Sequence, residues 1–245
     1  ERPGCQVDHV LVLEARQGAG KSSAVRILAG DTYLGSLPDV RDRKGSAECL
    51  QARWVCEMGE LDALRGAASG RVKDFISQTT DYFRPAYARV AAEYPRQVVF
   101  VGTTNESQYL SDVTGARRYW PVKCVTLDRA RLVADRDQLW AEALTLYRQG
   151  APWWGDETAE GLAREEQEQR FTADEWEPIV ARWLQNGSDG QEVTTGRVLE
   201  GALQIKPEDW DRASQTRAGQ ILSRLGYLMV RVQRDGVRMR TYVLP

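Results

Sequence analysis

The sequence contains very little histidine and no paired cysteines. His9 is the only histidine among 245 residues, and the four cysteines stand apart without a CxxC pair (Cys5, Cys49, Cys56 and Cys124). One histidine and four separate cysteines disfavour a zinc site built from Cys and His ligands. They also disfavour a catalytic site that depends on a histidine dyad. Scattered free thiols are typical of a reducing compartment, so we expect a cytoplasmic protein.

Long apolar runs and a strong net charge are also missing. No hydrophobic stretch approaches the roughly 20 residues that a membrane helix needs, and the polar start ERPGCQVDH is unlike a signal peptide. We therefore expect no association with a membrane. The composition is that of an ordinary soluble globular protein, with 42% hydrophobic and 28% charged residues and a formal net charge of −2.

The charge is divided along the chain. Residues 156–177 hold nine acids and two bases, a balance of −7, whereas residues 212–245 hold seven arginines and one acid, a balance of +6. We expect residues 153–172 to form an acidic helical connector between two modules. The alternative is a solvated helix followed by a basic edge.

Short apolar runs alternate with helical stretches over residues 1–152. Three runs have the length and β-branched content of buried strands, and a fourth contains Pro121, which is typical of an edge strand. These runs are HVLVL (9–13), WVCEM (54–58), VVFVG (98–102) and YWPVKCV (119–125). Strands separated by helices predict an α/β domain with a largely parallel sheet.

The pattern changes after residue 173. Three stretches have helical spacing: WEPIVARWLQNG, TTGRVLEGAL and RAGQILSRLGY. Asp235-Gly236 then separates two alternating runs, which is a strong hairpin signal. This order predicts a small winged-helix-like domain over residues 173–245.

The strongest local signal is the glycine-rich segment that follows the first strand and precedes an apolar helix. Its GxGKS pattern predicts a P-loop, in which backbone N–H groups and a helix N-terminus surround a phosphate chain. The expected ATP-binding residues are Arg16, Gln17, Gly18, Ala19, Gly20, Lys21, Ser22 and Ser23. Lys21 is expected to reach the β- and γ-phosphates, and Ser22 to hold Mg²⁺. The alternative is an exposed loop with a helix cap, and Ala15 stands where the usual pattern has Gly.

Hydrolysis also requires an acid near the metal and a group that orients water. The second strand ends in Glu57 and Glu60. We expect Glu57 at the metal and Glu60 at the water, an assignment that the spacing leaves open. Asn105 follows the third strand and is expected to orient water, although Asn is also an ordinary turn residue. Either acid has its own alternative, a buried paired carboxylate or a helix cap.

A pair of arginines, Arg117 and Arg118, precedes the fourth strand. Such a pair suits charge stabilisation on the phosphates, often across a subunit boundary. The alternative is a surface pair in solvated salt bridges.

These motifs, in this order, resemble the virulence-associated protein E family. The matching stretches are LVLEARQGAGKSS, WVCEMGELDAL, VKDFISQTTDYFRPAYAR, PRQVVFVGTTNE, YLSDVTGARRYWPV and RDQLWAEAL, roughly residues 5–155. The family comprises P-loop ATPases of phages, plasmids and pathogenicity islands, related to superfamily 3 helicases and viral primase-helicases within the AAA+ group.

The resemblance implies an ATPase core with Mg²⁺, replication-linked DNA, a homo-oligomeric ring such as a hexamer, and an upstream primase-like or other domain. It assigns Lys21 and Ser22 to nucleotide, Glu57 or Glu60 to Walker B, and Asn105 to sensor 1. Arg117 and Arg118 fall in the arginine-finger region. Because the chain begins close to the first strand, we expect a fragment or a short form.

Two segments are candidates for contact with single-stranded or forked DNA. Superfamily 3 helicases place a DNA-contacting β-hairpin between the second and third strands, where the sequence has YFRPAYAR. We expect contacts from Lys73, Arg84 and Arg89 there, and from Arg217 and Arg224 beside the recognition helix of the basic tail. The expected wing carries Arg231, Arg234, Arg238 and Arg240. The alternatives are that the aromatic residues belong to the core and that the tail docks a protein.

The motifs and the family resemblance together predict Mg²⁺-dependent ATP hydrolysis coupled to DNA, and the resemblance implies a replicative-type helicase of a phage or other mobile element. The alternative is a non-unwinding DNA-binding replication initiator or regulator that ATP controls. A small-molecule kinase or GTPase is a weaker alternative. The nearest string to the guanine-reading motif NKxD is TTNE, which lacks the Lys and the Asp.

Overall fold

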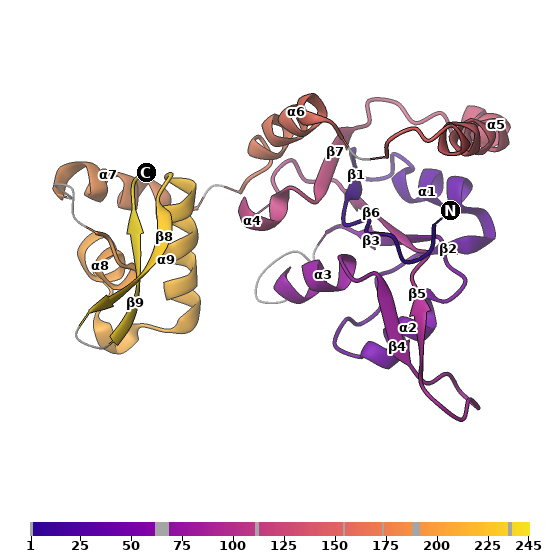
Figure 1. Cartoon of the computed structure of the whole chain (residues 1–245). Coiled ribbons are helices and arrows are strands. Elements are labelled where there is room, and N and C mark those ends of the chain that lie inside the picture. Colours follow the sequence, from indigo (N-terminus) through magenta and orange to yellow (C-terminus); the bar gives the residue numbers. More distant parts are fainter. Residues whose placement is uncertain are drawn as a thin grey trace. The chain divides into compact units, whose positions relative to one another are not determined.

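The computed structural model describes residues 2–61, 69–110, 113–153, 155–172, 174–187, 192–234 and 237–245. The chain divides into two compact units, Glu1–Phe171 and Thr172–Pro245, and each is described by itself (Figure 1). Among the described residues, no helix combines the length and the apolar character needed to cross a bilayer.

The first unit is built on a five-stranded parallel sheet. In spatial order its strands are β2 (Tyr33–Leu34), β3 (Val55–Gly59), β6 (Val99–Thr104), β1 (Val10–Glu14) and β7 (Tyr119–Lys123). All four strands expected from the sequence are present, and the strand with Pro121 lies at the edge. The α/β prediction is therefore confirmed. The short strand β2 was not predicted, because two residues leave no alternating pattern to detect.

Helices cover both faces of this sheet. Alternate strand residues such as Val12 and Phe100 enter the larger core, together with Leu50 and Val72 from two of the helices. The opposite face packs against Val25. The helices of this unit are α1 (Lys21–Ala29), α2 (Arg43–Leu50), α3 (Ser69–Ile76), α4 (Val113–Ala116), α5 (Arg129–Arg148) and α6 (Glu157–Glu168).

The acidic segment differs from the expected connector, because α6 packs against the sheet of the first unit. The buried Gln167 side chain donates a hydrogen bond to the Tyr119 carbonyl at 2.8 Å. Arg170, which is 6% exposed, forms a buried ion pair with Glu14 at the end of β1. A buried guanidinium needs such a partner, so this pair fixes the segment that leads to the second unit.

A β-hairpin of β4 (Thr80–Phe83) and β5 (Ala92–Pro95) projects from the first unit (Figure 1). A buried ion pair holds its base. The Arg96 guanidinium donates to both carboxylate oxygens of Asp81 at 2.7 and 2.8 Å, and it also donates to the Phe75 carbonyl of α3. The base of the hairpin is therefore fixed to α3.

Asp81→Ala is expected to destabilise the first unit strongly. The substitution leaves the Arg96 guanidinium, whose side chain is 5% exposed, without its anion. Removing one partner of a buried pair costs about 3–5 kcal/mol. Denaturant unfolding of the variant measures this loss, with Asp39→Ala as the control, because Asp39 pairs with Arg41 at the surface. Equal losses in the two variants would contradict the prediction.

The second unit contains α7 (Glu177–Gly187), α8 (Thr195–Arg197), a π-helical turn (Val198–Ala202), α9 (Arg212–Arg224), and the antiparallel strands β8 (Leu228–Arg234) and β9 (Val237–Val243). Its core includes Val180, Leu199, Ile221 and Tyr242. Helices followed by a hairpin are the order that the sequence predicts. The Asp235-Gly236 turn lies outside the described residues.

Candidate functional site

The loop between β1 and α1 has a backbone that only glycine adopts easily. Gly18 and Gly20 have φ angles of 77° and 93°, in the left-handed region. Gly20 is the N-cap of α1 and makes no side-chain cap, so the first N–H groups of this nine-residue helix have no capping oxygen. A helix start with open N–H groups is an anion-binding arrangement.

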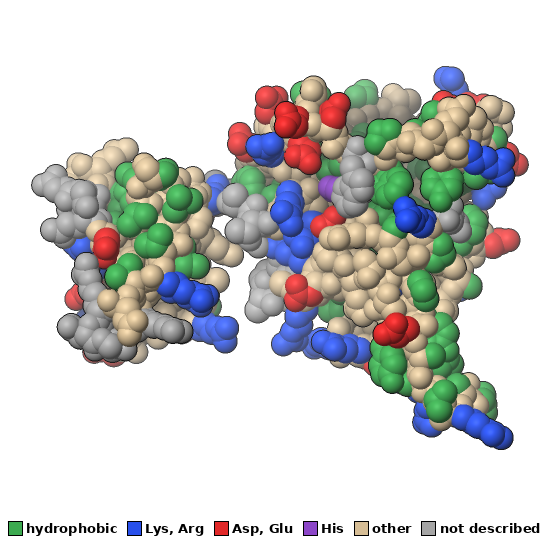
Figure 2. Space-filling view, viewed as in Figure 1, with side chains coloured by type: hydrophobic (Ala, Val, Ile, Leu, Met, Phe, Trp, Pro, Cys, Tyr) green, Lys and Arg blue, Asp and Glu red, His purple; other side chains and the backbone are tan. Residues whose placement is uncertain are grey.

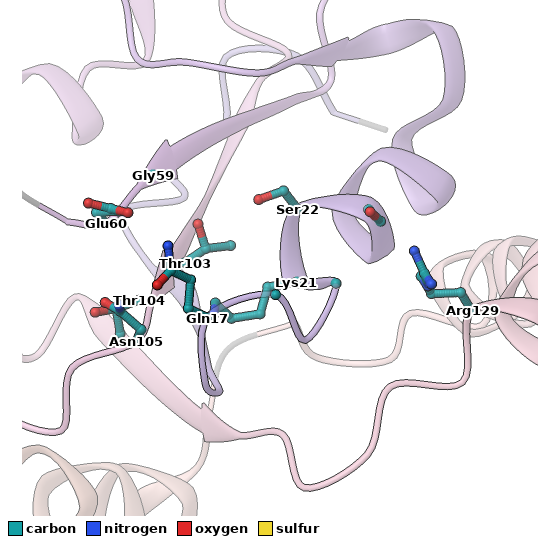
Figure 3. Close-up of a pocket in the computed structure, with 12 residues that line it drawn as sticks. Gln17, Lys21, Ser22, Gly59, Glu60, Thr103, Thr104, Asn105 and Arg129 are labelled. Carbon is teal, nitrogen blue, oxygen red and sulfur yellow. The ribbon is translucent and has the colours of Figure 1, made fainter.

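This loop forms one wall of a cavity of about 370 Å³ at the carboxyl ends of the strands. The lining comes from the loop and the start of α1 (Gln17, Gly18, Gly20, Lys21, Ser22 and Ser23), the ends of β3 and β6 (Gly59, Glu60, Thr103, Thr104 and Asn105), and Arg129 of α5. Figure 3 shows Glu60 and Asn105 on one side of the cavity and Arg129 on the other, with Lys21 between them. The sequence candidates from the glycine-rich loop and from two strand ends therefore meet in one place.

Lys21 closes the loop on itself. Its ammonium group donates to the carbonyl of Ala15 at 2.7 Å and to that of Arg16 at 3.2 Å. The Ala19 N–H also donates to the Arg16 carbonyl, at 3.2 Å. The cation thus lies where the loop curves. A bound anion would attract it more strongly than these two neutral carbonyl oxygens do.

Glu57 lies beneath the loop and is 2% exposed. Its Oε1 accepts hydrogen bonds from the hydroxyls of Ser22 at 2.6 Å and Thr103 at 2.8 Å. The Tyr33 hydroxyl donates to its Oε2. Burial, together with this hydrogen bond, raises the pKa of Tyr33 to about 12, so this hydroxyl remains a donor at neutral pH. Three hydroxyl donors therefore hold the Glu57 carboxylate in place beneath the loop.

Glu60 occupies the turn that follows β3. It is exposed and has a φ of 53°, which is uncommon for a residue with a side chain. The next residue, Leu61, is 1% exposed and packs over Gly102, where a Cβ atom would lie 2.6 Å from the Leu61 side chain. This contact holds the turn, and the turn directs Glu60 toward the cavity.

The sheet order determines how the acids and Asn105 are placed. Because β6 lies between β1 and β3, Asn105 is positioned between the β1–α1 loop and the turn that carries Glu60. Asn105 is exposed and lines the cavity. The arrangement leaves a polar gap between a cation and a carboxylate, with an amide beside them.

Sequence reasoning missed Arg129, which lines the same cavity. Its side chain lies 3.2 Å from the position that a Cβ atom of Gly20 would occupy. One signal was present in the sequence. Arg129 and Arg131 stand in the first turn of α5, behind the N-cap Asp128, where the helix dipole disfavours cations.

Arg117 and Arg118 lie in a second cavity of about 530 Å³, next to the amino ends of β1 and β7. The five residues of β1 span about 17 Å, so the pair is far from the loop of its own chain. Arg118 donates to the Ser77 hydroxyl at 3.1 Å and lies 4.0 Å from Asp8, whereas Arg117 is exposed. Arg164 of α6 lines the same cavity, and sequence reasoning missed it.

The hairpin residues Arg84 and Arg89 are exposed. Tyr87 at its tip is fully exposed, with a φ of 68°, whereas Phe83 is 6% exposed and packs on the Tyr94 ring. Of the aromatic residues considered as core, only Phe83 is buried.

Three candidate DNA contacts are placed differently from expectation. Lys73 is 9% exposed and packs against Gly115 inside the first unit. Arg217 donates twice to Asp174 at 2.9 Å and stacks on the Trp176 ring, and Arg224 pairs with Glu177 at 3.2 Å. Arg217 and Arg224 thus pair with acids of the second unit, which the sequence alone does not reveal.

The fold and the cavity together define an α/β protein with a polar site at the carboxyl ends of a five-stranded parallel sheet. The family model of the virulence-associated protein E-like domain matches residues 1–172. The chain therefore belongs to this family, and the resemblance seen in its motifs is confirmed.

Solved structures extend the comparison. The chain is similar to the apo structure of the NrS-1 C-terminal region, with 13% identity and a TM-score of 0.51 over 98% of this chain and 68% of that one. The A form apo structure of the same region gives 13% identity and a TM-score of 0.49, over 98% and 67%. At this identity the first likeness supports the fold alone. No curated protein matches the chain.

Proposed function

We propose that this protein is a P-loop ATPase that requires Mg²⁺ and acts on DNA. The observation that carries the proposal is the convergence of Lys21, Ser22 and the buried Glu57 at the carboxyl ends of the central strands. A loop cation, a hydroxyl and an acid at this edge of a parallel sheet are the parts that phosphoryl transfer requires.

ATP binds with its phosphates on the β1–α1 loop. The open N–H groups at the start of α1 and the Lys21 ammonium meet the negative charge of the phosphate chain. Arg129 adds a second cation at the edge of the cavity. The loop carbonyls that Lys21 contacts exchange for phosphate oxygens.

The residues present fit a magnesium ion. Ser22 and Glu57 offer hard oxygen donors 2.6 Å apart. Among the described residues, no group of three or more His, Cys, Asp and Glu side chains gathers in a way that would hold a metal. Phosphate oxygens and water would therefore complete the coordination, as is usual for Mg²⁺. When bound, the ion neutralises charge on the phosphate oxygens.

Hydrolysis uses the groups at the ends of β3 and β6. Asn105 orients a water molecule toward the γ-phosphorus, and Glu60 accepts its proton as the new P–O bond forms. The bond between the γ-phosphorus and the β–γ bridging oxygen breaks, which releases ADP and phosphate. Glu57, fixed by three hydroxyl donors, stays at the metal side.

A neighbouring subunit completes the site. Arg117 and Arg118 lie at the opposite ends of the strands from their own loop, so they act on the nucleotide of another copy in a homo-oligomeric ring such as a hexamer. Arg117 is the better placed of the two, because Arg118 has partners within its own chain.

DNA is contacted by the projecting hairpin and by the second unit, which we assign as winged-helix-like. Arg84, Arg89 and Tyr87 present charge and a stacking ring at the exposed end of the hairpin. In the second unit Arg231 and Arg240 are exposed and directly opposed across β8 and β9. Such a like-charge pair is unfavourable unless an anion lies beside it.

Family membership supports a replication helicase of a phage or other mobile element, working with an upstream primase-like domain or other replication proteins. The test is ATP turnover with and without single-stranded DNA, together with the native mass. We expect a multimer whose turnover DNA stimulates and which separates a forked duplex. DNA binding without strand separation would favour the ATP-controlled initiator, and absence of turnover would refute the ATPase.

A further inference from the structure

A basic hollow lies apart from both cavities described above. It has a volume of about 590 Å³ and is lined by Arg41 and Arg43 at the start of α2, and by Arg71, Asp74 and Gln78 of α3 and the turn after it. Three arginines and one acid give the lining a net positive charge. Figure 2 shows lysine and arginine side chains gathered on this face, below α3 and beside α2 and β4.

Two of the three arginines form no ion pair with an acid in the part of the chain that the structure describes, although Asp74 lines the same hollow. Arg41 pairs with Asp39 at 3.0 Å. Arg43 and Arg71 are exposed, and neither forms an ion pair with any residue that the structure describes. Two guanidinium groups and one carboxylate border the hollow, so a positive charge remains there, and a bound anion is attracted to it.

The hollow adjoins the base of the hairpin. Gln78, which lines it, donates to the carbonyl of Thr80, the first residue of β4, at 2.7 Å. The Gln78 side chain also accepts a hydrogen bond from the buried Arg96 at 3.2 Å. Gln78 therefore joins the hollow to the base of the hairpin, and the fully exposed Tyr87 lies at the hairpin tip.

The chemistry of the lining points to a phosphate chain without its bases. Phe75 is 8% exposed and its ring is covered by the Arg96 guanidinium at 4.3 Å, so it offers no stacking surface. A free nucleotide would lack base recognition here. Arginine-lined grooves are typical of proteins that follow the backbone of a single strand.

We propose that this hollow binds the phosphodiester backbone of single-stranded DNA, through Arg43 and Arg71. The proposal rests on the DNA-dependent function above and extends it, because it adds a contact that the hairpin tip does not make. The strand runs from the aromatic tip to the arginines at the hairpin base.

The test compares two double variants of equal charge change. R43Q/R71Q removes the two hollow arginines, and R131Q/R148Q removes two exposed arginines of α5. Fluorescence anisotropy measures the affinity for labelled oligothymidylate over a series of salt concentrations. R43Q/R71Q is expected to bind about tenfold more weakly. The affinity falls with salt, with a slope of about −0.7 in log K against log salt for each phosphate contact. Loss of two contacts therefore makes the slope shallower by about 1.4.

R131Q/R148Q is expected to match the wild type, and R43K/R71K to retain most of the affinity because the charges remain. Turnover without DNA and the native mass are measured for each variant, to confirm that folding and assembly are intact. Unchanged affinity and slope in R43Q/R71Q would overturn this inference and leave the ATPase proposal standing. A fall in native mass that parallels the loss of DNA binding would also overturn it. If the wild type itself does not bind the oligonucleotide, the DNA part of the proposed function fails as well.

Discussion

Lys21→Ala is expected to reduce ATP turnover by at least about 10²-fold, as for other preorganised donors that stabilise transition-state charge. Lys21 is the cation at the centre of the β1–α1 loop, and its ammonium bridges the carbonyls of Ala15 and Arg16. The substitution removes the charge that, in the proposed function, meets the phosphates, and also the bridge between the two loop carbonyls. A coupled assay for phosphate release, at saturating ATP and Mg²⁺, measures the loss.

Lys206→Ala is the matched control for this experiment. Lys206 is exposed in the second unit and pairs with Glu208 at 3.7 Å, so its removal changes the net charge equally and leaves the cavity untouched. Its turnover is expected to equal that of the wild type. Thermal unfolding of both variants shows whether the sheet remains folded. Wild-type turnover in a folded Lys21→Ala protein would refute the assignment of the loop.

Those parts of the fold and site that depend on local pattern could be predicted from the sequence. Val10 and Val12 alternate in β1 and are buried, as the apolar run predicts. Gly18 and Gly20 have positive φ angles, which glycine adopts most easily. Because the loop needs glycine at these positions, their spacing in the sequence makes the loop recognisable. Both features depend only on residues that are close together in the sequence, so a local pattern is enough to predict them.

The parts that depend on distant partners could not be predicted. Arg170 stands in an acidic run and seemed to belong to a connector, but its partner Glu14 lies 156 positions away in sequence. Arg217 looked like a DNA contact until the structure showed Asp174 and Trp176 around it. The composition of a segment gives the number of its cations. Only the folded structure shows which of these cations already pair with an acid.

The same distinction applies to the arginine pair at positions 117 and 118. The sequence presents them as equivalent, but their surroundings differ. Arg118 contacts Ser77 and Asp8 within its own chain, so its loss would also disturb packing around α3. Arg117 is exposed at the edge of the second cavity, so it is free to act on the nucleotide of another copy, as the proposed function requires.

Arg117→Ala is therefore expected to reduce turnover by about 10³-fold or more while nucleotide affinity stays close to that of the wild type. An arginine that stabilises transition-state charge is worth 10³ to about 10⁵ in rate. Because Arg117 lies about 17 Å or more from the loop of its own chain, across the length of β1, the effect arises between subunits. Phosphate release and the affinity for a fluorescent ATP analogue are measured on the same preparation.

Mixing two inactive variants separates action between subunits from action within one. A Lys21→Ala subunit keeps Arg117, and an Arg117→Ala subunit keeps the intact loop, so an interface between them has every group. Exchange of subunits is expected to restore part of the turnover, in proportion to the number of such interfaces. Mixtures that remain inactive, although native mass shows that the subunits have exchanged, would contradict the action of Arg117 across a subunit interface. Wild-type turnover in Arg117→Ala alone would instead place Arg117 outside the reaction, as an ordinary solvated surface residue.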